Sequence, residues 1–464
     1  MDYLPGSVLT RALRDLPRRS LLDRLHAMRA LAEARGVRYV DDAGRPRTIE
    51  IVPKPWLLTS HQLLCFHRVA QELGGALLRV AHLAGRLASV RAVVPFEPER
   101  EAWMRLATHP RSRPLAVIGR LDSTAVYGHA GWRRDFRMLE PNAVGVGGVY
   151  YAPTSCRIVM DVMGDVLTRA LPGRVITAMP DPRQLLVEEL KAVAKRLGRP
   201  LKGVALIENM DYTTGTDEFQ ELARDLLARG VPAVVADPRQ LSWRRGHLYA
   251  GRTPVDLCYR DSELAEFVEM EAGGRRLTAM REVVRQGRLI SGLTWEFDQK
   301  SAWEIFTDAR YAKYFSAAQH RLFRDHVLWT RLVREAVVPD PQGRLVDLPR
   351  YIHTHRARLV LKPNTLFGGV GVTIGPETSQ PVWERTLHRA LRGRERYVVQ
   401  ALADVPADAY PSLAPDGGLR WRERHVVSGF FFSSTGIGLI GRFSSRRVVN
   451  VSQGGGLLPA LWVH

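Results

Sequence analysis

The stretch LVLKPNTLFGGVGVTIG, residues 359–375, predicts a β-hairpin with a glycine-rich tip. Its first strand is apolar and ends at Lys362, and the tip carries Gly368, Gly369 and Gly371. Glycine lacks a Cβ, so such a tip lets backbone N–H groups approach phosphate oxygens, whose charge a lysine at the base neutralises. The pattern is neither a Walker A loop nor a Rossmann fingerprint, because no helix follows the glycines. Two interpretations stay open: a phosphate clamp or simply a tight hairpin.

A second apolar strand, RYVVQALADVP, begins about 35 residues after Lys362. Its backbone can offer N–H and C=O groups to the edge of an adenine ring, with the Asp404 carboxylate near the ribose. Taken alone, the segment is equally well an ordinary strand and turn. Its position between the glycine hairpin and a last group of strands is what favours the nucleotide interpretation.

Far upstream, residues 115–140 predict a second hairpin, with strands PLAVIGRLDSTAVYG and WRRDFRMLE around a turn at 128–131. This pairing sets Asp122 roughly opposite Glu140. Positions two apart on a strand share a face, so Asn142 joins Glu140 and Arg120 joins Asp122. Carboxylate and amide oxygens of this kind suit Mg²⁺ that bridges nucleotide phosphates. Without the phosphate loop, the alternative of a solvated polar hairpin end is the simpler one.

Between these regions the chain predicts an α/β unit, with strand GVALIENM, helix EFQELARDLLARG and strand VPAVVADP from residue 203 onward. This order predicts a small parallel sheet. Helices are expected over residues 7–36, 60–87, 276–335 and 380–392. Further strands are expected at RHVVSGFFFSS, GIGLIGRFSS and RVVNVSQGGG near the end of the sequence.

The chain has 464 residues, which predicts two or three domains rather than one core. It contains no run of about 18 apolar residues and no secretory pattern, so we expect no membrane partner and a cytoplasmic location. Three scattered cysteines predict neither a zinc site nor disulfides. The net charge of +19 favours an anionic partner, but the arginines are spread along the chain, so we do not expect nucleic acid.

In their order, these motifs resemble the circularly permuted ATP-grasp proteins, the group that includes glutathionylspermidine synthase and many uncharacterised bacterial relatives. In ordinary ATP-grasp ligases the lysine and glycine hairpin come first and the metal-binding Glu-x-Asn last, whereas here the order is reversed. The similarity runs from about residue 40 to the end. The matching motifs are Gly119-Arg120-Leu121-Asp122, Leu139-Glu140-Pro141-Asn142, Gly147-Gly148-Val149-Tyr150, Asp298-Gln299-Lys300, His326-Val327-Leu328-Trp329-Thr330-Arg331, Val360-Leu361-Lys362-Pro363, Gly368-Gly369-Val370-Gly371-Val372, and Gly441-Arg442 leading to Asn450-Val451-Ser452.

The resemblance implies a set of site residues and two cofactors, ATP and Mg²⁺. Mg²⁺ would be held by Asp122, Glu140 and Asn142. Arg120 and Arg442 would be catalytic, because they stabilise charge on the transferring phosphoryl group and on the tetrahedral adduct. ATP would be bound by Lys300, Lys362, Gly368, Gly369 and Gly371, with its adenine at Val399, Gln400 and Ala401.

The implied fold is α+β: an ATP-grasp fold in circularly permuted order, with an inserted α/β pre-ATP-grasp domain and a helical N-terminal region. The expected parts are a helical region over residues 1–105, the metal-binding half over 106–200, the α/β domain over 201–275 and the ATP-binding half over 276–464.

The implied activity is an ATP-dependent carboxylate–amine ligase that forms an amide or peptide bond through an acyl phosphate. Its substrates would be small molecules or peptides, and the basic charge suits an acidic acyl donor. Two alternatives are a non-catalytic nucleotide-binding or scaffold protein of the same fold and an ATP-dependent enzyme with an RNA or aminoacyl-tRNA partner. The substrate pair and the oligomeric state are not given by the sequence.

Overall fold

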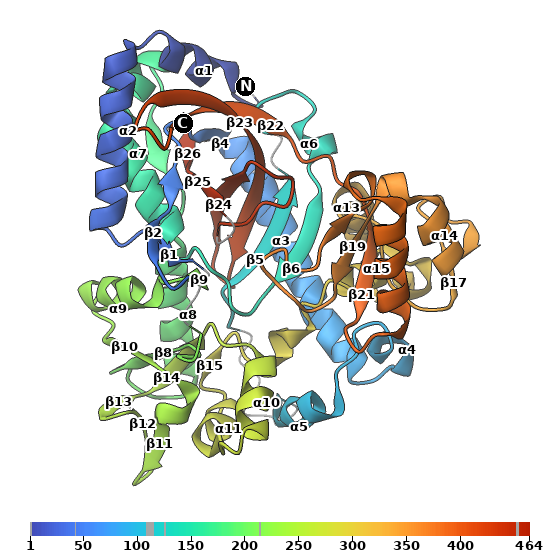
Figure 1. The fold of residues 1–464 in the computed structure, drawn as a ribbon. Coiled ribbons are helices and arrows are strands. Elements are labelled where there is room, and N and C mark those ends of the chain that lie inside the picture. Colours follow the sequence, from blue (N-terminus) through green and yellow to red (C-terminus); the bar gives the residue numbers. More distant parts are fainter. Residues whose placement is uncertain (1, 42, 108–115, 125–126, 213–214, 452–453) are drawn as a thin grey trace.

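A computed structural model describes residues 2–41, 43–107, 116–124, 127–212, 215–451 and 454–464 (Figure 1). The chain is 42% helical and 24% strand, which confirms the α+β class. Within the described ranges, no helix is both long enough and apolar enough to cross a bilayer. Parts of three predictions fall outside these ranges: residues 115 and 125–126 of the first strand of the hairpin at 115–140, residues 452–453 of the predicted strand RVVNVSQGGG, and Ser452 of the last motif.

A sheet of seven strands forms the centre of the molecule, with the order β3-β25-β24-β23-β5-β6 and β22 paired to β23. It joins strands from both ends of the chain, because β23 pairs antiparallel with β5. The strands are β3 (Glu50–Ile51), β5 (Gly119–Thr124), β6 (Met138–Asn142), β22 (Ala407–Leu413), β23 (Leu419–Phe432), β24 (Ile437–Ser444) and β25 (Gly456–Leu458).

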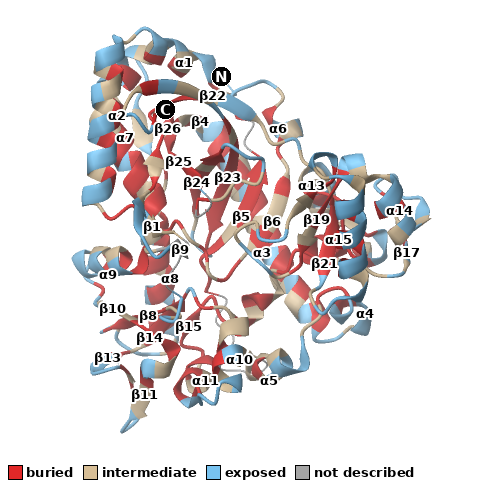
Figure 2. Ribbon diagram, viewed as in Figure 1, coloured by how far each residue is buried: buried red, intermediate tan, exposed pale blue. Residues whose placement is uncertain are grey.

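Helices pack against both faces of this sheet, and Figure 2 shows β24 coloured mostly as buried. Successive strand residues point to opposite faces, so Phe430 and Phe432 pack into the core under α3, while Phe431 packs under α7 and α8. The helices around the central sheet are α1 (Ser7–Arg14), α2 (Arg18–Ala34), α3 (Ser60–Ala84), α4 (Ala88–Arg91), α7 (Tyr151–Ala170) and α8 (Pro182–Arg196).

The predicted hairpin of residues 115–140 is present, but its second strand is shorter than expected. Residues Trp132–Asp135 form helix α6, so the strand begins only at Met138. β5 and β6 pair antiparallel with Asp122 opposite Glu140, which confirms the predicted register. The strand expected at RVVNVSQGGG was also wrong, because among its described residues only Gly456 belongs to a strand, β25.

The segment with the glycine hairpin folds into a four-stranded sheet of order β16-β21-β19-β20, which lies to one side of the central sheet in Figure 1. The glycine tip joins β19 and β20, which pair antiparallel as expected. Its elements are α12 (Ala302–Thr307), α13 (Ala317–His326), β16 (Thr330–Leu332), β17 (Val337–Pro339), β18 (Leu345–Asp347), α14 (Leu348–Thr354), β19 (Leu359–Pro363), β20 (Thr373–Ile374), α15 (Gln380–Arg392) and β21 (Tyr397–Ala401).

The α/β unit forms the predicted parallel sheet, with the order β10-β8-β14-β15. The sheet extends to Ile290, so residues 276–335 contain strands β15 and β16 besides the expected helices. Its elements are β8 (Val204–Ile207), α9 (Phe219–Ala228), β10 (Ala233–Ala236), β11 (Leu241–Arg244), β12 (His247–Ala250), β13 (Thr253–Val255), β14 (Leu257–Arg260), α10 (Leu264–Ala272), α11 (Thr278–Arg285) and β15 (Leu289–Ile290), with α5 (Pro98–Ala107) beside them.

Two small sheets connect these parts. One has the order β4-β26-β7 and joins the last strand of the chain to the start of α3, and the other, β2-β1-β9, joins the N-terminal region to the α/β unit. The strands are β1 (Arg38–Val40), β2 (Pro46–Thr48), β4 (Trp56–Thr59), β7 (Ile176–Ala178), β9 (Gly215–Thr216) and β26 (Ala460–Val463).

Candidate active site

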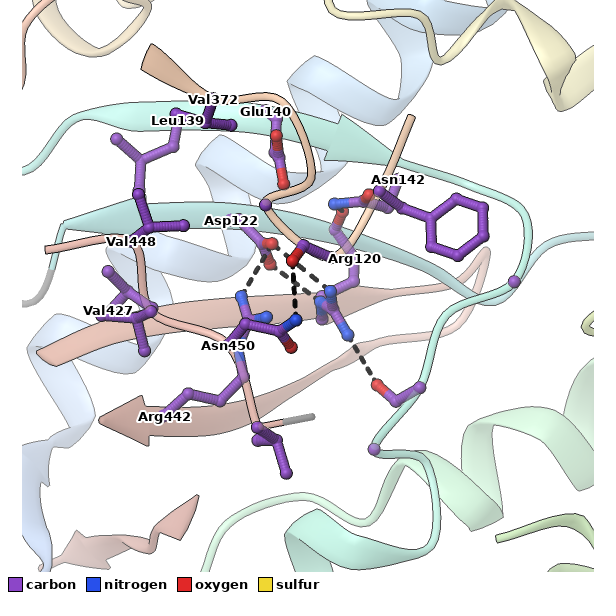
Figure 3. A pocket seen from close by; sticks show the side chains of 18 of the residues that line it. Arg120, Asp122, Leu139, Glu140, Asn142, Val372, Val427, Arg442, Val448 and Asn450 are labelled. Atoms are coloured by element: carbon purple, nitrogen blue, oxygen red, sulfur yellow. Dashed lines mark hydrogen bonds and ion pairs between the residues drawn. The ribbon is translucent and has the colours of Figure 1, made fainter. Parts of the chain in front are cut away.

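One cavity of about 870 Å³ lies where the central sheet, the glycine hairpin and the α/β unit meet. It brings together residues that the sequence places more than 200 positions apart. Figure 3 shows its floor, where β5 and β6 carry the acidic and amide side chains and β24 carries Arg442. The predicted site residues that line it are Arg120, Asp122, Glu140, Asn142, Lys362, Gly368, Gly369, Gln400 and Arg442.

Asp122 lies between two arginines on the floor of the cavity (Figure 3). Its carboxylate accepts from Arg120 Nε at 2.8 Å and forms an ion pair with Arg442 Nη2 at 2.7 Å. Burial to 3% exposure acts to raise the pKa of Asp122, but the two guanidinium groups outweigh it and hold that pKa below its ordinary value. Asp122 is therefore an anion that fixes both arginines. Arg442 Nε is buried and has no hydrogen-bond partner among the described residues.

Glu140 and Asn142 project from β6 beside this triad. The Glu140 carboxylate lies 3.6 Å from Lys300 Nζ, and the Asn142 side-chain amide donates to the Arg120 carbonyl at 3.5 Å. The carboxylate of Glu140 and the side-chain carbonyl of Asn142 are hard oxygen donors in the same cavity as Lys362, Gly368 and Gly369. Asp122 is on the neighbouring strand, but its oxygens already contact Arg120 and Arg442.

The two predicted lysines occupy different positions. Lys362 lines the cavity and donates to the side-chain carbonyl of Gln400 at 2.8 Å, and burial lowers its pKa. Lys300 lies behind Glu140 in a separate small cavity of about 40 Å³. Its Nζ donates to the Leu366 carbonyl at 2.5 Å, at the base of the glycine tip. Lys362 therefore lines the main cavity, whereas Lys300 contacts the glycine loop and Glu140.

The glycine tip has the backbone geometry that only glycine adopts readily. Gly368, Gly369 and Gly371 have φ values of 68°, 74° and 72°. A Cβ on Gly369 would meet Val448 at 2.5 Å. The Asn450 side-chain amide donates to the Gly368 carbonyl at 2.7 Å, so the loop after β24 holds the tip in place.

The predicted adenine segment is only partly placed in the cavity. β21 is an interior strand, flanked by β16 on one edge and β19 on the other. The backbones of Val399 and Ala401 are therefore already paired with neighbouring strands. The side chain of Gln400 lines the cavity together with the residues that follow the strand, which are Leu402, Ala403 and Val405.

Sequence reasoning missed an acidic wall of the cavity, which the α/β unit provides. Burial raises the pKa of both Glu208 and Glu266 to about 7 and also raises the pKa of Asp261. A signal was present, because Glu208 follows β8 and Asp261 follows β14, and ligands bind at the carboxyl ends of parallel strands. The carboxylates of this acidic wall are Glu208, Asp217, Asp261, Glu263 and Glu266.

Comparison with known proteins gives a match at the level of structure only. No protein-family model and no curated protein matches the sequence. The chain is similar to a glutathione synthetase-like effector from Globodera pallida in its apo form, with a TM-score of 0.60, 12% identity, and coverage of 95% of this chain and 97% of the effector. A likeness at this identity concerns the fold alone.

Two further solved structures resemble the chain more weakly. One is a putative γ-glutamylcysteine synthetase from Methylobacillus flagellatus, with a TM-score of 0.40, 9% identity and coverage of 84% and 87% of the two chains. The other is a RimK-domain ATP-grasp protein from Sphaerobacter thermophilus, with a TM-score of 0.25, 16% identity and coverage of 54% and 91%. The likeness to the Globodera pallida effector shows that the chain shares the overall fold of that protein.

Proposed function

We propose that this protein is an ATP-dependent carboxylate–amine ligase with a circularly permuted ATP-grasp core. The observation that carries the proposal is the single cavity in which Arg120, Glu140 and Asn142 face Lys362 and the glycine tip. Cationic groups, glycine N–H groups and hard oxygens are the three elements that phosphoryl transfer requires. The motif order and the glutathione synthetase-like fold support the same assignment.

The residues present fit the triphosphate of ATP. The tip at Gly368 and Gly369 has positive φ, and a side chain at Gly369 would collide with Val448, so the loop is a cradle that only backbone can form. Lys362 at its base supplies a positive charge, and the buried Arg442 Nε supplies a donor that meets no acceptor among the described residues. We assign the adenine to the side of Gln400, Leu402 and Val405.

Mg²⁺ fits in the same cavity if protein and phosphate oxygens bind it together. It takes one or two protein carboxylates and fills its remaining positions with phosphate oxygens and water, so Glu140 and Asn142 suffice as the protein ligands. The described residues contain no group of three or more acidic, histidine or cysteine side chains placed to hold a metal without phosphate. Asp122 joins the metal only if an arginine releases it to contact a phosphate. Bound Mg²⁺ would neutralise charge on the β- and γ-phosphates.

The proposed chemistry has two steps. An oxygen of the substrate carboxylate forms a bond to the γ-phosphorus, and the bond to ADP breaks, which leaves an acyl phosphate. The amine nitrogen then bonds to the acyl carbon, phosphate leaves, and the nitrogen loses a proton. Arg120 and Arg442 stabilise the charge that builds up in both steps. The glycine tip covers the acyl phosphate and excludes water, which would hydrolyse it.

The acidic wall indicates where the amine lies. Burial raises the pKa of Glu208, Asp261 and Glu266, and a bound ammonium group would favour their ionised form, whereas a second anionic substrate would not. The acyl donor is then held near the arginines. In this arrangement, the basic residues attract anionic groups only on the phosphate side of the cavity.

The test is calorimetric binding of Mg-ATP, followed by ADP release against a panel of carboxylates and amines. Lys362→Ala is expected to weaken nucleotide binding at least about tenfold, since it removes a charge-assisted contact. Glu140→Gln is expected to retain binding without Mg²⁺ but to lose turnover. Lys191→Ala on the exposed face of α8 is the control and should match the wild type.

Two outcomes would contradict the ligase proposal. Absence of Mg-ATP binding in the wild type would remove the nucleotide site altogether. Binding with no ADP release across the panel would instead indicate a non-catalytic nucleotide-binding protein of the same fold.

A further inference from the structure

Glu218 is a buried carboxylate of the α/β unit that points away from its own helix. It directly precedes α9 and is 4% exposed. Its Oε1 accepts from the backbone N–H of Gly148 at 2.8 Å, and its Oε2 accepts from that of Tyr150 at 3.4 Å. Both donors belong to the turn before α7, in another part of the molecule. Glu218 therefore supplies, from a distance, an acceptor for N–H groups at a helix start whose own N-cap residue forms no side-chain cap.

The peptide group between Gly147 and Gly148 connects Glu218 to the active site. Its N–H is bound by Glu218, and its C=O accepts from Arg120 Nη1 at 2.6 Å. In a trans peptide these two groups point in opposite directions, and the described residues contain no cis peptide. One peptide plane is thus held at both ends, with a carboxylate on one side and a guanidinium on the other.

This peptide plane depends on glycine. Gly148 has a φ of 99°, and a Cβ there would meet Ile440 Cδ1 at 2.4 Å. The carbonyl at its other end fixes one nitrogen of Arg120, while Asp122 fixes Nε at 2.8 Å (Figure 3). Hydrogen bonds in such a chain polarise and strengthen one another. Without the hydrogen bond to Glu218, the peptide group can rotate. Arg120 then loses its fixed acceptor at the Gly147 carbonyl and is held by Asp122 alone.

We infer that Glu218 is a positioning residue, which orients Arg120 through the peptide group of Gly147 and Gly148 and so couples the α/β unit to the catalytic floor. The inference builds on the function proposed for Arg120, but the hydrogen-bonded link is independent of it. Glu218 makes no contact with the reacting groups in this assignment. It acts on the placement of Arg120.

The kinetic test compares Glu218→Ala, Glu218→Gln, Arg120→Ala and the double variant Glu218→Ala/Arg120→Ala. Glu218→Ala should lower kcat about tenfold or more and change the KM for ATP less than about threefold, because Arg120 is assigned to the transition state. Glu218→Gln retains one acceptor oxygen and should recover part of kcat. In the Arg120→Ala background, Glu218→Ala should cause no further loss, since its effect passes through Arg120.

A matched control separates positioning from general destabilisation. Leu226→Ala removes a fully buried side chain from the same helix α9 and leaves both hydrogen bonds of Glu218 in place. It should lower the midpoint of denaturation about as much as Glu218→Ala yet change kcat less than about twofold. An equal loss of kcat in Leu226→Ala, or independent effects of Glu218→Ala and Arg120→Ala, overturns the inference.

Hydrogen exchange tests the link without any assay of activity. The amide of Gly148 should exchange at least about tenfold faster in Glu218→Ala than in the wild type or in Leu226→Ala, measured by mass spectrometry on the segment 143–151. If the wild type turned over no substrate, the ligase proposal would fail while this measurement still decided the role of Glu218. Unchanged protection of that segment in Glu218→Ala overturns the inference.

Discussion

Gln400 and Leu139 join the two halves of the cavity through one hydrogen bond, in which the Gln400 side-chain amide donates to the Leu139 carbonyl at 3.0 Å. The same amide nitrogen donates to Thr330 Oγ1 at 2.9 Å, and the amide oxygen accepts from Lys362 Nζ at 2.8 Å. Leu139 directly precedes Glu140. A single buried side chain thus sets the position of the phosphate-side lysine relative to the metal-side strand.

Replacement of Gln400 by leucine is expected to affect both stability and nucleotide binding. It leaves Lys362 Nζ and the carbonyl of Leu139 without their partner, which costs about 1–3 kcal/mol of unfolding free energy. The affinity for Mg-ATP should fall about tenfold because Lys362 loses its fixed position. Denaturant titration and calorimetry measure the two effects. Gln71→Leu, which removes an amide donor on α3 to the Ser433 carbonyl, is the control and should leave ATP affinity unchanged.

Replacement of Asp122 by asparagine is expected to be strongly destabilising. It removes the anion that the buried Arg120 and Arg442 share, so two positive charges lie close together without compensation. Loss of one partner from a buried ion pair costs about 3–5 kcal/mol. The exposed pair of Asp416 and Arg420 provides the control, since Asp416→Asn should change stability by less than about 1 kcal/mol. Equal effects of the two substitutions would contradict the buried triad.

Replacement of Gly369 by alanine is expected to weaken nucleotide binding beyond its effect on stability. The positive φ of 74° costs a non-glycine residue about 1–2 kcal/mol, and the added Cβ meets Val448 at 2.5 Å. Gly417→Ala is the matched control, because Gly417 lies in the turn before β23 with a φ of 77°, and a Cβ added there would meet no described atom within 4 Å. Both variants should lose stability, but calorimetry should show weaker Mg-ATP binding only for Gly369→Ala.

The stability of the protein is expected to fall as pH rises toward neutrality through the titration of Glu218. Burial raises its pKa from 4.5 to about 7, with Asp261 adding to the effect. The folded state therefore holds the proton more tightly than the unfolded chain does. The stability that this gives is complete below about pH 4.5 and is lost as pH rises through about 7, up to about 3 kcal/mol.

The measurement is the difference in unfolding free energy between the wild type and Glu218→Gln from about pH 5 to about pH 8, a range that brackets the raised pKa. The subtraction removes the titration of the histidines and of Glu208 and Glu266, which both proteins share. The wild type should lose stability relative to the variant as pH rises. A difference that stays constant over this range would show that Glu218 does not titrate in it.

Local patterns in the sequence were sufficient for the elements that carry the site. An apolar run followed by glycines predicted the hairpin of β19 and β20, and pairing of the other hairpin about its turn predicted that Asp122 lies opposite Glu140. They failed where tertiary packing overrides propensity, as in the short helix α6 and in the predicted last strand, which begins only with β25. The roles assigned to the site residues stay predictions.

The sequence by itself determined which backbone segments form hairpins and which side chains share a strand face, because both follow from local geometry. The tertiary structure alone decided the partners of those side chains. Pairing of β23 with β5 and with β24 brings Arg442 onto Asp122, and the packing of two sheets brings the Gln400 side chain to the Leu139 carbonyl. Such contacts depend on chain segments that are distant in sequence, and no local pattern of residues encodes them.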